Sequence, residues 1–260
     1  MEGNFGGRKM RVILLGSGSY SGTPKALCNC ENCTRARKFP QYRRTRFSMY
    51  IPKIKALIDP SPDLYYHLRH LNEKVENVFI THPHFDHIAG LPELQVFKEV
   101  TFYSHEKTLH VAKLLQETFL GEREWRYTPL DFNRWYGFGN FRVKHFPVVH
   151  QPGEVAGGFI LEIGEKKIAI TGDTGPEILK DERVLQDIQG ADLLVSEMTH
   201  KHSIPKTHLG VEDAIKLAQM VGANKTLFVH ISHSNYTHEE LEEKVREAGI
   251  VGRDFMHLKI

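Results

Sequence analysis

The sequence predicts an α/β fold in which two β-sheets are sandwiched between layers of helices. The first half of the chain is rich in short apolar runs that pair as hairpins, whereas the second half alternates helical and strand patterns. Reactive side chains also recur directly after predicted strands, at Asp59, His82, His150, Asp173, Glu197 and His230. Strand ends that meet at one edge of such a sandwich would bring these side chains together.

The first half begins with a buried strand that enters a glycine-rich loop over residues 16–24, and such a loop can present backbone N–H groups to a phosphate. Its apolar runs and helical spacings predict the following elements in order. They are a strand over 11–15, a hairpin of 47–51 and 54–58, a helix over 62–71, a strand over 77–80 and a helix near 91–97.

The second half contains the regular alternation of helix and strand. Its expected elements are strand 101–103, helix 106–120, strand 141–149, hairpin 158–163 with 167–170, helix 176–188, strand 193–196, helix 211–221, strand 226–229, helix 238–248 and strand 255–260. Residues 122–139 are rich in aromatic side chains, which we expect to serve packing rather than substrate stacking.

The length of 260 residues fits one domain over 10–260, preceded by a polar, glycine-rich tail over 1–9 that we expect to be flexible. The composition, 40% hydrophobic and 25% charged, is that of a globular protein. No apolar run approaches the roughly 18–20 residues that span a bilayer, so we expect no membrane and a cytoplasmic location. A formal net charge of +2 excludes no class of partner.

A basic run lacks any acidic residue and comprises Arg35, Arg37, Lys38, Arg43, Arg44 and Arg46. We interpret it as a solvated face, and a phosphate-attracting rim is the alternative.

Three cysteines, Cys28, Cys30 and Cys33, lie within six residues. An odd, tightly clustered set argues against disulfides and for a reducing compartment. Three thiolates can share one ion, and tetrahedral zinc then requires a fourth ligand from elsewhere in the chain.

The segment from Thr81 to His87 carries four metal-competent side chains, His82, His84, Asp86 and His87. Imidazoles with a carboxylate suit zinc, manganese or iron better than calcium or magnesium. In an extended loop His82 and His84 project to the same side, and Asp86 and His87 can turn toward a second ion. Unrelated surface histidines or satisfied core histidines are the alternative, which so dense a cluster beside a buried strand disfavours.

Taken in order, Asp59, the histidine segment, His150, Asp173 and His230 resemble the five motifs of the metallo-β-lactamase superfamily, whose fold is a four-layer αββα sandwich. The resemblance implies two divalent ions, Mn²⁺ or Zn²⁺. His82, His84 and His150 would hold one ion and Asp86, His87 and His230 the other. Asp173 would bridge them, while Asp59 would orient a ligand imidazole. We count Asp59 and Asp86 with the catalytic residues.

The segments 196–200 and 207–210 resemble the Glu/His pair of the phosphodiesterase branch, which includes tRNase Z. The resemblance implies that His208, supported by Glu197, contacts the scissile phosphate and protonates the leaving oxygen. A surface ion pair is the alternative for these two residues.

The cysteine cluster and the basic residues after it resemble the PhnP-like cyclic phosphodiesterases. That resemblance implies a structural Zn²⁺ held by Cys28, Cys30, Cys33 and His233. The PqqB-like branch shares the cysteines, but the intact His-x-His-x-Asp-His segment argues against it.

We therefore expect a hydrolase that cleaves small cyclic or activated phosphodiesters with a hydroxide held by two metal ions. The alternatives are a tRNase Z-like endonuclease for RNA 3′ ends and a non-catalytic metal-binding relative. Residues 101–139 contain no basic, glycine-rich arm for tRNA, so nucleic acid is not the favoured partner. A homodimer is compatible with the sequence.

Overall fold

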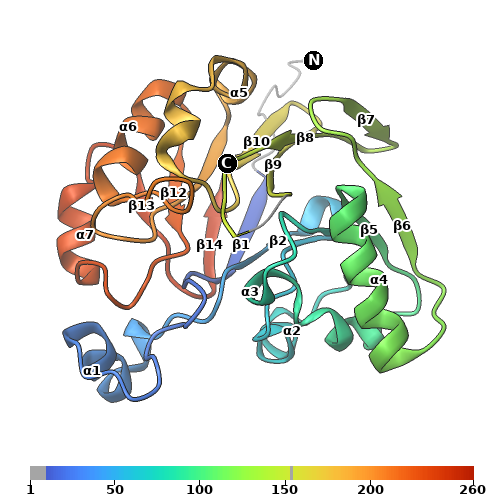
Figure 1. Cartoon of the computed structure of the whole chain (residues 1–260), viewed down its shortest axis with the longest axis horizontal. Helices are drawn as coiled ribbons and strands as arrows, with labels where there is room; N and C mark the ends of the chain where they lie inside the picture. Colours follow the sequence, from blue (N-terminus) through green and yellow to red (C-terminus); the bar gives the residue numbers. More distant parts are fainter. Residues whose placement is uncertain (1–9, 153–154) are drawn as a thin grey trace, which may run out of the picture.

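The computed structural model describes residues 10–152 and 155–260, so the expectation of a flexible tail over 1–9 lies outside the described residues. In the described part of the chain, two seven-stranded sheets face each other and helices cover the outer face of each. Figure 1 shows helices α5–α7 on one side of the sheets and α2–α4 on the other. The predicted αββα sandwich is confirmed.

The first sheet has the strand order β14-β1-β2-β3-β4-β5-β6. Its strands are β1 (Arg11–Gly16), β2 (Ser48–Ile51), β3 (Ala56–Ile58), β4 (Asn77–Phe79), β5 (Thr101–Ser104), β6 (Arg126–Pro129) and β14 (Met256–Lys259). Pairing is antiparallel from β14 to β3 and parallel from β3 to β6. The carboxyl ends of β3 and β4 therefore lie at the same edge.

The second sheet has the order β13-β12-β11-β10-β9-β8-β7. Its strands are β7 (Trp135–Phe138), β8 (Phe141–Pro147), β9 (Gly157–Ile163), β10 (Lys166–Ile170), β11 (Leu193–Glu197), β12 (Thr226–Val229) and β13 (Ile250–Val251). Pairing is antiparallel from β7 to β10 and parallel from β10 to β13. The residues that follow β10, β11 and β12 consequently emerge side by side.

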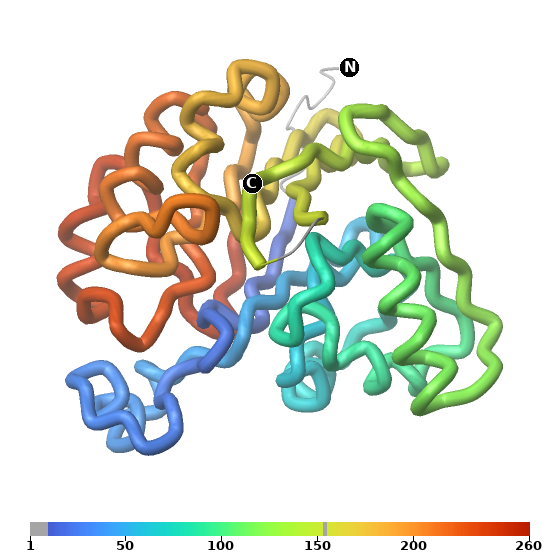
Figure 2. The backbone as a smooth tube through the Cα atoms, in the orientation of Figure 1, coloured from blue at the N-terminus to red at the C-terminus, as the bar shows by residue number. Residues whose placement is uncertain are grey.

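The helices are α1 (Glu31–Lys38), α2 (Leu64–Leu71), α3 (Phe85–Ile88), α4 (Glu106–Leu120), α5 (Glu182–Ile188), α6 (Val211–Val221) and α7 (His238–Lys244). Short 3₁₀ helices cover Pro40–Tyr42, Pro52–Ile54, Leu91–Val96 and Pro176–Lys180. The tube in Figure 2 follows the chain from the blue N-terminal strand to the red C-terminal strand, and these two strands, β1 and β14, are paired.

Alternating side chains give the sandwich three apolar layers. Along β1, Val12 and Leu14 face the second sheet, whereas Ile13 and Leu15 pack with α2, α3 and α4. A third layer joins the second sheet to α5, α6 and α7. Because both faces of the strands are covered, the strands read as continuous apolar runs.

Several expected elements differ in the structure. The aromatic segment 122–139 contains strands β6 and β7, which we did not predict, and α1, α3 and β13 were also missed. The helix expected near 91–97 is 3₁₀, and the helix expected over 238–248 ends at Lys244. The helix expected over 176–188 is divided at Asp181, whose side chain accepts a hydrogen bond from the Val184 N–H and so starts α5.

The interpretation of the basic run as a solvated face is wrong for several of its members. Arg35 pairs with Glu239 at 2.8 Å, and Arg46 pairs with Asp63 at 3.1 Å. Arg44 donates to the Ser17 hydroxyl and to the Gly252 carbonyl, and burial lowers its pKa to about 10. These guanidinium groups hold loops together.

Within residues 10–152 and 155–260, no helix is both long enough and apolar enough to cross a bilayer.

His145 of β8 provides a test of how the core responds to acid. It is fully buried, and its ring stacks on Phe159 with the ring centroids 4.5 Å apart. Burial lowers its pKa to about 3, against about 6.5 when unfolded, so the unfolded chain binds the proton more tightly. This contribution to stability is complete above about pH 6.5 and declines toward pH 3, by about 2 kcal/mol at pH 5.

We predict that the free energy of unfolding falls less in His145→Leu than in the wild type when the pH is lowered from about 7.5 to about 5. The two decreases, measured by urea denaturation, should differ by about 2 kcal/mol. His110→Leu, at an exposed position of α4, is the matched control and should keep the wild-type loss. An equal loss in wild type and His145→Leu would contradict the prediction.

Candidate functional site

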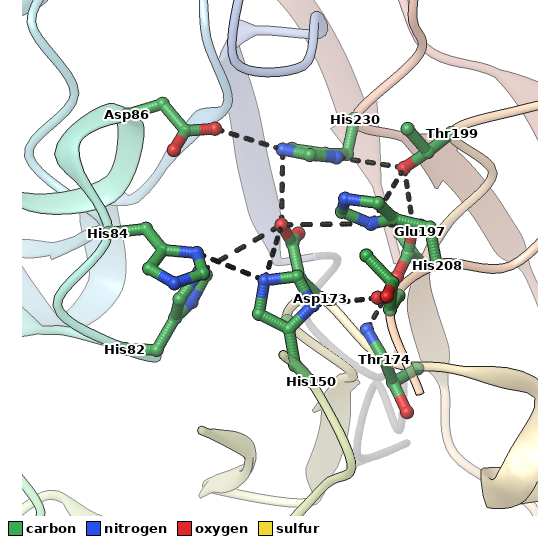
Figure 3. A network of polar contacts seen from close by, with 12 residues as sticks. His82, His84, Asp86, His150, Asp173, Thr174, Glu197, Thr199, His208 and His230 are labelled. Atoms are coloured by element: carbon green, nitrogen blue, oxygen red, sulfur yellow. Dashed lines mark hydrogen bonds and ion pairs between the residues drawn. The ribbon is translucent and has the colours of Figure 1, made fainter. Parts of the chain in front are cut away.

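The residues predicted after strands do converge at one edge of the sandwich. Asp59 follows β3 and the histidine segment follows β4 in the first sheet, whereas His150, Asp173 and His230 follow β8, β10 and β12 in the second. Figure 3 shows Asp173 between His82, His84 and His150 on one side and Asp86 and His230 on the other. We call the seven predicted active-site ligands the strand-edge cluster: His82, His84, Asp86, His87, His150, Asp173 and His230.

His82, His84 and His150 form the first half of the cluster, with one ligand nitrogen of each within 4.8 Å of the others. His84 Nδ1 lies 3.0 Å from His150 Nε2. His84 Nε2 is 2.6 Å from the Pro152 carbonyl, and His150 Nδ1 is 2.6 Å from the Thr207 carbonyl. A carbonyl only accepts, so each of these nitrogens donates, and the other nitrogen of each ring keeps its lone pair for a cation.

Asp86, His87 and His230 form the second half. His230 Nε2 is 3.2 Å from Asp86 Oδ2, and His87 Nε2 is 3.3 Å from the same oxygen. Helix α3 presents Asp86 and His87 from consecutive positions, although it spans only four residues. Burial alone would raise the pKa of Asp86, but the neighbouring His87 and His230 outweigh it and hold this pKa well below its usual range.

The carboxylate of Asp173 joins the two halves. Its Oδ2 lies 3.4 Å from both His87 Nε2 and His230 Nε2, 3.8 Å from His150 Nε2 and 3.9 Å from His82 Nε2. The turn that delivers it requires glycine at position 172, where φ is +61° and a Cβ would lie 3.0 Å from the Gly157 carbonyl oxygen.

Asp59 lies behind the cluster and contacts only one of its imidazoles. Its carboxylate accepts hydrogen bonds from the Thr81 N–H at 2.7 Å and the Thr81 hydroxyl at 2.8 Å. The same group accepts from His87 Nδ1 at 2.8 Å, which directs His87 Nε2 into the cluster.

The chemistry of the cluster fits divalent cations. His82 Nε2 is buried and lacks a hydrogen-bond partner among the described residues. Orphaned buried nitrogens are costly unless another group pairs with them. Imidazole and carboxylate donors arranged around a shared oxygen are the set that zinc or manganese accepts.

Glu197 and His208 form a second polar unit beside Asp173. Glu197 Oε2 is 3.0 Å from His208 Nδ1, and His208 Nδ1 lies 3.9 Å from Asp173 Oδ2. Burial by itself lowers the pKa of His208, but the charge and hydrogen bond of Glu197 outweigh it and raise this pKa to about 9. Glu197 is buried and 11 residues away in sequence, so the alternative of a surface ion pair is wrong.

Thr199 is a site residue that the sequence analysis missed. Its hydroxyl donates to Glu197 Oε2 and therefore accepts from His230 Nδ1, 2.9 Å away, which leaves His230 Nε2 free for the cluster. The spacing could have indicated this role, because Thr199 is two residues after Glu197 in an extended segment, where such residues lie on the same face.

A pocket of about 340 Å³ opens onto the cluster. The residues lining it are Tyr20, His84, Phe85, Asp86, His150, Gln151, Pro152, Asp173, Thr207, His208 and His230. None of these lining residues is Lys or Arg. A volume of this size suits a small organic ligand.

The cysteine cluster, defined as Cys28, Cys30, Cys33 and His233, also assembles, with its ligand atoms within 4.8 Å of one another. His233 Nδ1 is 3.5 Å from Cys28 Sγ and 3.6 Å from Cys30 Sγ. Residues some 200 positions apart thus meet beside the loop that follows β12. Three thiols and one imidazole are a set that suits tetrahedral zinc.

An αββα sandwich with histidines and carboxylates gathered at the ends of its strands defines the class of metal-dependent hydrolases with the metallo-β-lactamase fold. The chain belongs to the beta-lactamase superfamily, since the profile of the Beta-lactamase superfamily domain matches residues 55–231.

Three known proteins illustrate the relationship. The chain is 26% identical over 275 residues to an octanoyltransferase of Porphyromonas gingivalis, covering 95% of this chain but 54% of that protein. The chain thus spans about half the length of that relative. It is 24% identical over 240 residues to ribonuclease BN of Erwinia tasmaniensis, covering 68% of this chain and 77% of that protein. A diphosphatase from the PhnP family superposes with a TM-score of 0.77 at 23% identity, covering 96% and 97% of the two chains, and supports the fold.

We predict that the two clusters hold metal independently. Asp173→Ala removes the shared oxygen of the strand-edge cluster, so it should lose the metal of that cluster and keep the metal of the cysteine cluster. Cys30→Ser should lose the metal of the cysteine cluster and keep that of the strand-edge cluster. Metal content after mild chelation, measured by mass spectrometry of the purified proteins, tests this. Asp131→Ala, which removes an exposed carboxylate, is the control. Equal metal content in all four proteins would contradict the assignment.

Proposed function

We propose that this protein is a dinuclear metal-dependent phosphodiesterase that cleaves small cyclic or otherwise activated phosphodiesters. The observation that carries the proposal is the pairing of His208 with Glu197 at 3.0 Å, directly beside Asp173. A metal-binding protein without turnover has no use for a buried carboxylate that keeps a neighbouring imidazole protonated. A hydrolase that expels an alkoxide does.

In this proposal His82, His84 and His150 would hold one ion and Asp86, His87 and His230 the other, with Asp173 as a ligand that both could share. Manganese and zinc both accept this donor set. Bound there, the ions would supply Lewis acidity that polarises the phosphoryl group and makes water a better nucleophile at neutral pH. Asp173 suits its place because, although burial raises its pKa, the surrounding imidazoles hold this pKa well below the usual range, so it stays anionic.

His208 supplies the proton of the reaction. Its Nδ1–H donates to Glu197, which leaves Nε2–H to donate to the substrate while the ring is protonated. As water oxygen bonds to phosphorus and the bond to the leaving oxygen breaks, the His208 proton passes to that oxygen. Water and diester thereby give a phosphomonoester and a hydroxyl group, which remain in one molecule when the diester is cyclic, and the proton lost by the water restores His208 to its starting form.

The pocket favours small diesters. Its volume of about 340 Å³ accommodates a molecule of mononucleotide size, and its described lining offers no Lys or Arg to follow a polyanionic backbone. Cleavage of RNA 3′ ends remains the second candidate, favoured by the similarity to ribonuclease BN. It would require a basic surface outside this pocket.

The cysteine cluster has a structural role in this proposal, with one Zn²⁺ joining the segment 28–33 to the loop that carries His230. Its three free thiols support a reducing compartment such as the cytoplasm.

The substrate prediction separates the two candidate functions. Manganese- or zinc-loaded protein should hydrolyse bis(p-nitrophenyl) phosphate and nucleoside 2′,3′-cyclic phosphates, and it should leave precursor tRNA intact. Product formation is followed by absorbance for the first substrate, by chromatography for the second and by gel for the third. Efficient tRNA cleavage with inert small diesters would reverse the ranking.

We predict that His208→Ala lowers kcat by about two to four orders of magnitude and leaves the metal content unchanged, since only the proton donor is lost. His202→Ala, at an exposed position of the same loop, is the matched control and should retain the wild-type kcat. p-Nitrophenolate leaves readily without a proton, so bis(p-nitrophenyl) phosphate does not test the role of His208 decisively. The decisive assay uses a cyclic diester with an alkoxide leaving group. Full activity of His208→Ala on that diester would contradict the assigned role.

A further inference from the structure

Two large aromatic side chains stand exposed at the pocket that opens onto the strand-edge cluster. Tyr20 is 61% exposed and Phe85 is 53% exposed, and both line the pocket. Their ring centroids are 6.1 Å apart and the rings are inclined at 54°. Single exposed aromatics are ordinary, but two that touch each other at the rim of a site mark a surface suited to an apolar ligand group.

The two residues reach the rim from loops that follow different strands of the first sheet, β1 and β4, which are separated by β2 and β3. Tyr20 lies in the loop that follows β1, and Phe85 starts α3 between His84 and Asp86. Phe85 is therefore adjacent in sequence to residues of both halves of the strand-edge cluster. The aromatic pair and the cluster line the same pocket, so a ligand with its phosphorus at the cluster could place its substituents against the pair.

The Tyr20 loop is held in place by its backbone. Arg46 Nε donates to the Tyr20 carbonyl at 3.1 Å, and the Gly22 N–H donates to the Ser19 carbonyl at 2.8 Å. At the start of the loop, the carboxylate of Asp254 accepts from the Ser17 N–H at 2.8 Å. A fixed loop presents its aromatic ring with little ordering cost on binding.

The distance between the rings decides how a ligand would be held. A planar group inserted between two aromatic rings needs two stacking separations of about 3.5 Å, or roughly 7 Å. A centroid distance of 6.1 Å with inclined rings is too small for this. A planar group can instead stack on one of the two rings and contact the edge of the other, so Tyr20 and Phe85 together form one aromatic wall of the pocket.

The charges around the pocket point to the same kind of ligand. Its described lining provides imidazoles, carboxylates, an amide and a hydroxyl beside the wall, without Lys or Arg. The strand-edge cluster and His208 would bind the phosphate, so the remainder of the ligand would pack against the two aromatic rings. A diester of a bare sugar leaves this wall unused, whereas a nucleobase covers it.

We propose that Tyr20 and Phe85 form a base-binding wall that makes nucleoside cyclic phosphodiesters, rather than cyclic phosphodiesters of a bare sugar, the preferred substrate class. This inference rests on the proposed phosphodiesterase function. Stacking of a base on an aromatic side chain is worth about 1–3 kcal/mol, or roughly 5- to 150-fold in affinity.

The test compares kcat/KM for adenosine 2′,3′-cyclic phosphate with that for ribose 2,3-cyclic phosphate. The wild type should prefer the nucleoside by about tenfold or more. Tyr20→Ala and Phe85→Ala should each reduce this ratio by about tenfold, chiefly through KM. Tyr20→Phe keeps the aromatic ring and should therefore keep the wild-type ratio. Misfolding would lower both substrates together and leave the ratio unchanged.

Matched controls come from equally exposed aromatics away from the pocket. Tyr65 is 60% exposed and Phe119 is 64% exposed, and Tyr65→Ala and Phe119→Ala should keep the wild-type ratio. Equal kcat/KM for the two substrates in the wild type, or an unchanged ratio in both wall variants that retain the wild-type kcat/KM for the ribose diester, would overturn the inference and leave the phosphodiesterase function standing.

Calorimetric titration of adenosine 2′,3′-cyclic phosphate into metal-loaded His208→Ala protein measures binding without turnover. Binding that weakens about tenfold when Tyr20→Ala is added supports the wall. It does so even if the wild type hydrolyses no diester, because the lack of hydrolysis would overturn only the proposed function. Binding unaffected by Tyr20→Ala and by Phe85→Ala would overturn the wall.

Discussion

A buried carboxylate surrounded by imidazoles is the constraint on which this structure depends. Asp173 Oδ2 has histidine nitrogens from both sheets within 3.4–3.9 Å. A buried charge costs several kcal/mol unless it is paired, so neither sheet can supply a stable site alone. The need to pair Asp173 with histidines from both sheets constrains how the sheets meet at this edge of the sandwich. The pocket lies at the same edge.

The outer hydrogen bonds explain why the imidazoles face inward. Asp59 accepts from His87 Nδ1, Thr199 from His230 Nδ1 and the Thr207 carbonyl from His150 Nδ1, while His84 uses its Nε2 on the Pro152 carbonyl. Each contact fixes one nitrogen as the donor and directs the other toward the cluster. A network that sets the tautomer of these four rings pre-organises the site before any ligand arrives.

The sequence predicted the sandwich and the strand-edge residues because buried strands are apolar runs and because the polar residues after them are conspicuous. It did not predict β6 and β7, whose half-exposed aromatic residues show no clear alternation. Arg44 was misread since no local pattern reveals that its partners, Ser17 and Gly252, come from distant segments. Likewise, Tyr20 becomes a pocket residue only through the loop that brings it beside Phe85.

The place of β1 in its sheet has a consequence for how the protein is made. β1 is the first strand of the described chain, yet it pairs on one side with β14, whose residues are synthesised about 240 positions later. Until then its outer edge offers unpaired backbone groups to any passing strand. Because long-range strand pairs close slowly, the first sheet can be completed only after nearly all of the described chain has been synthesised.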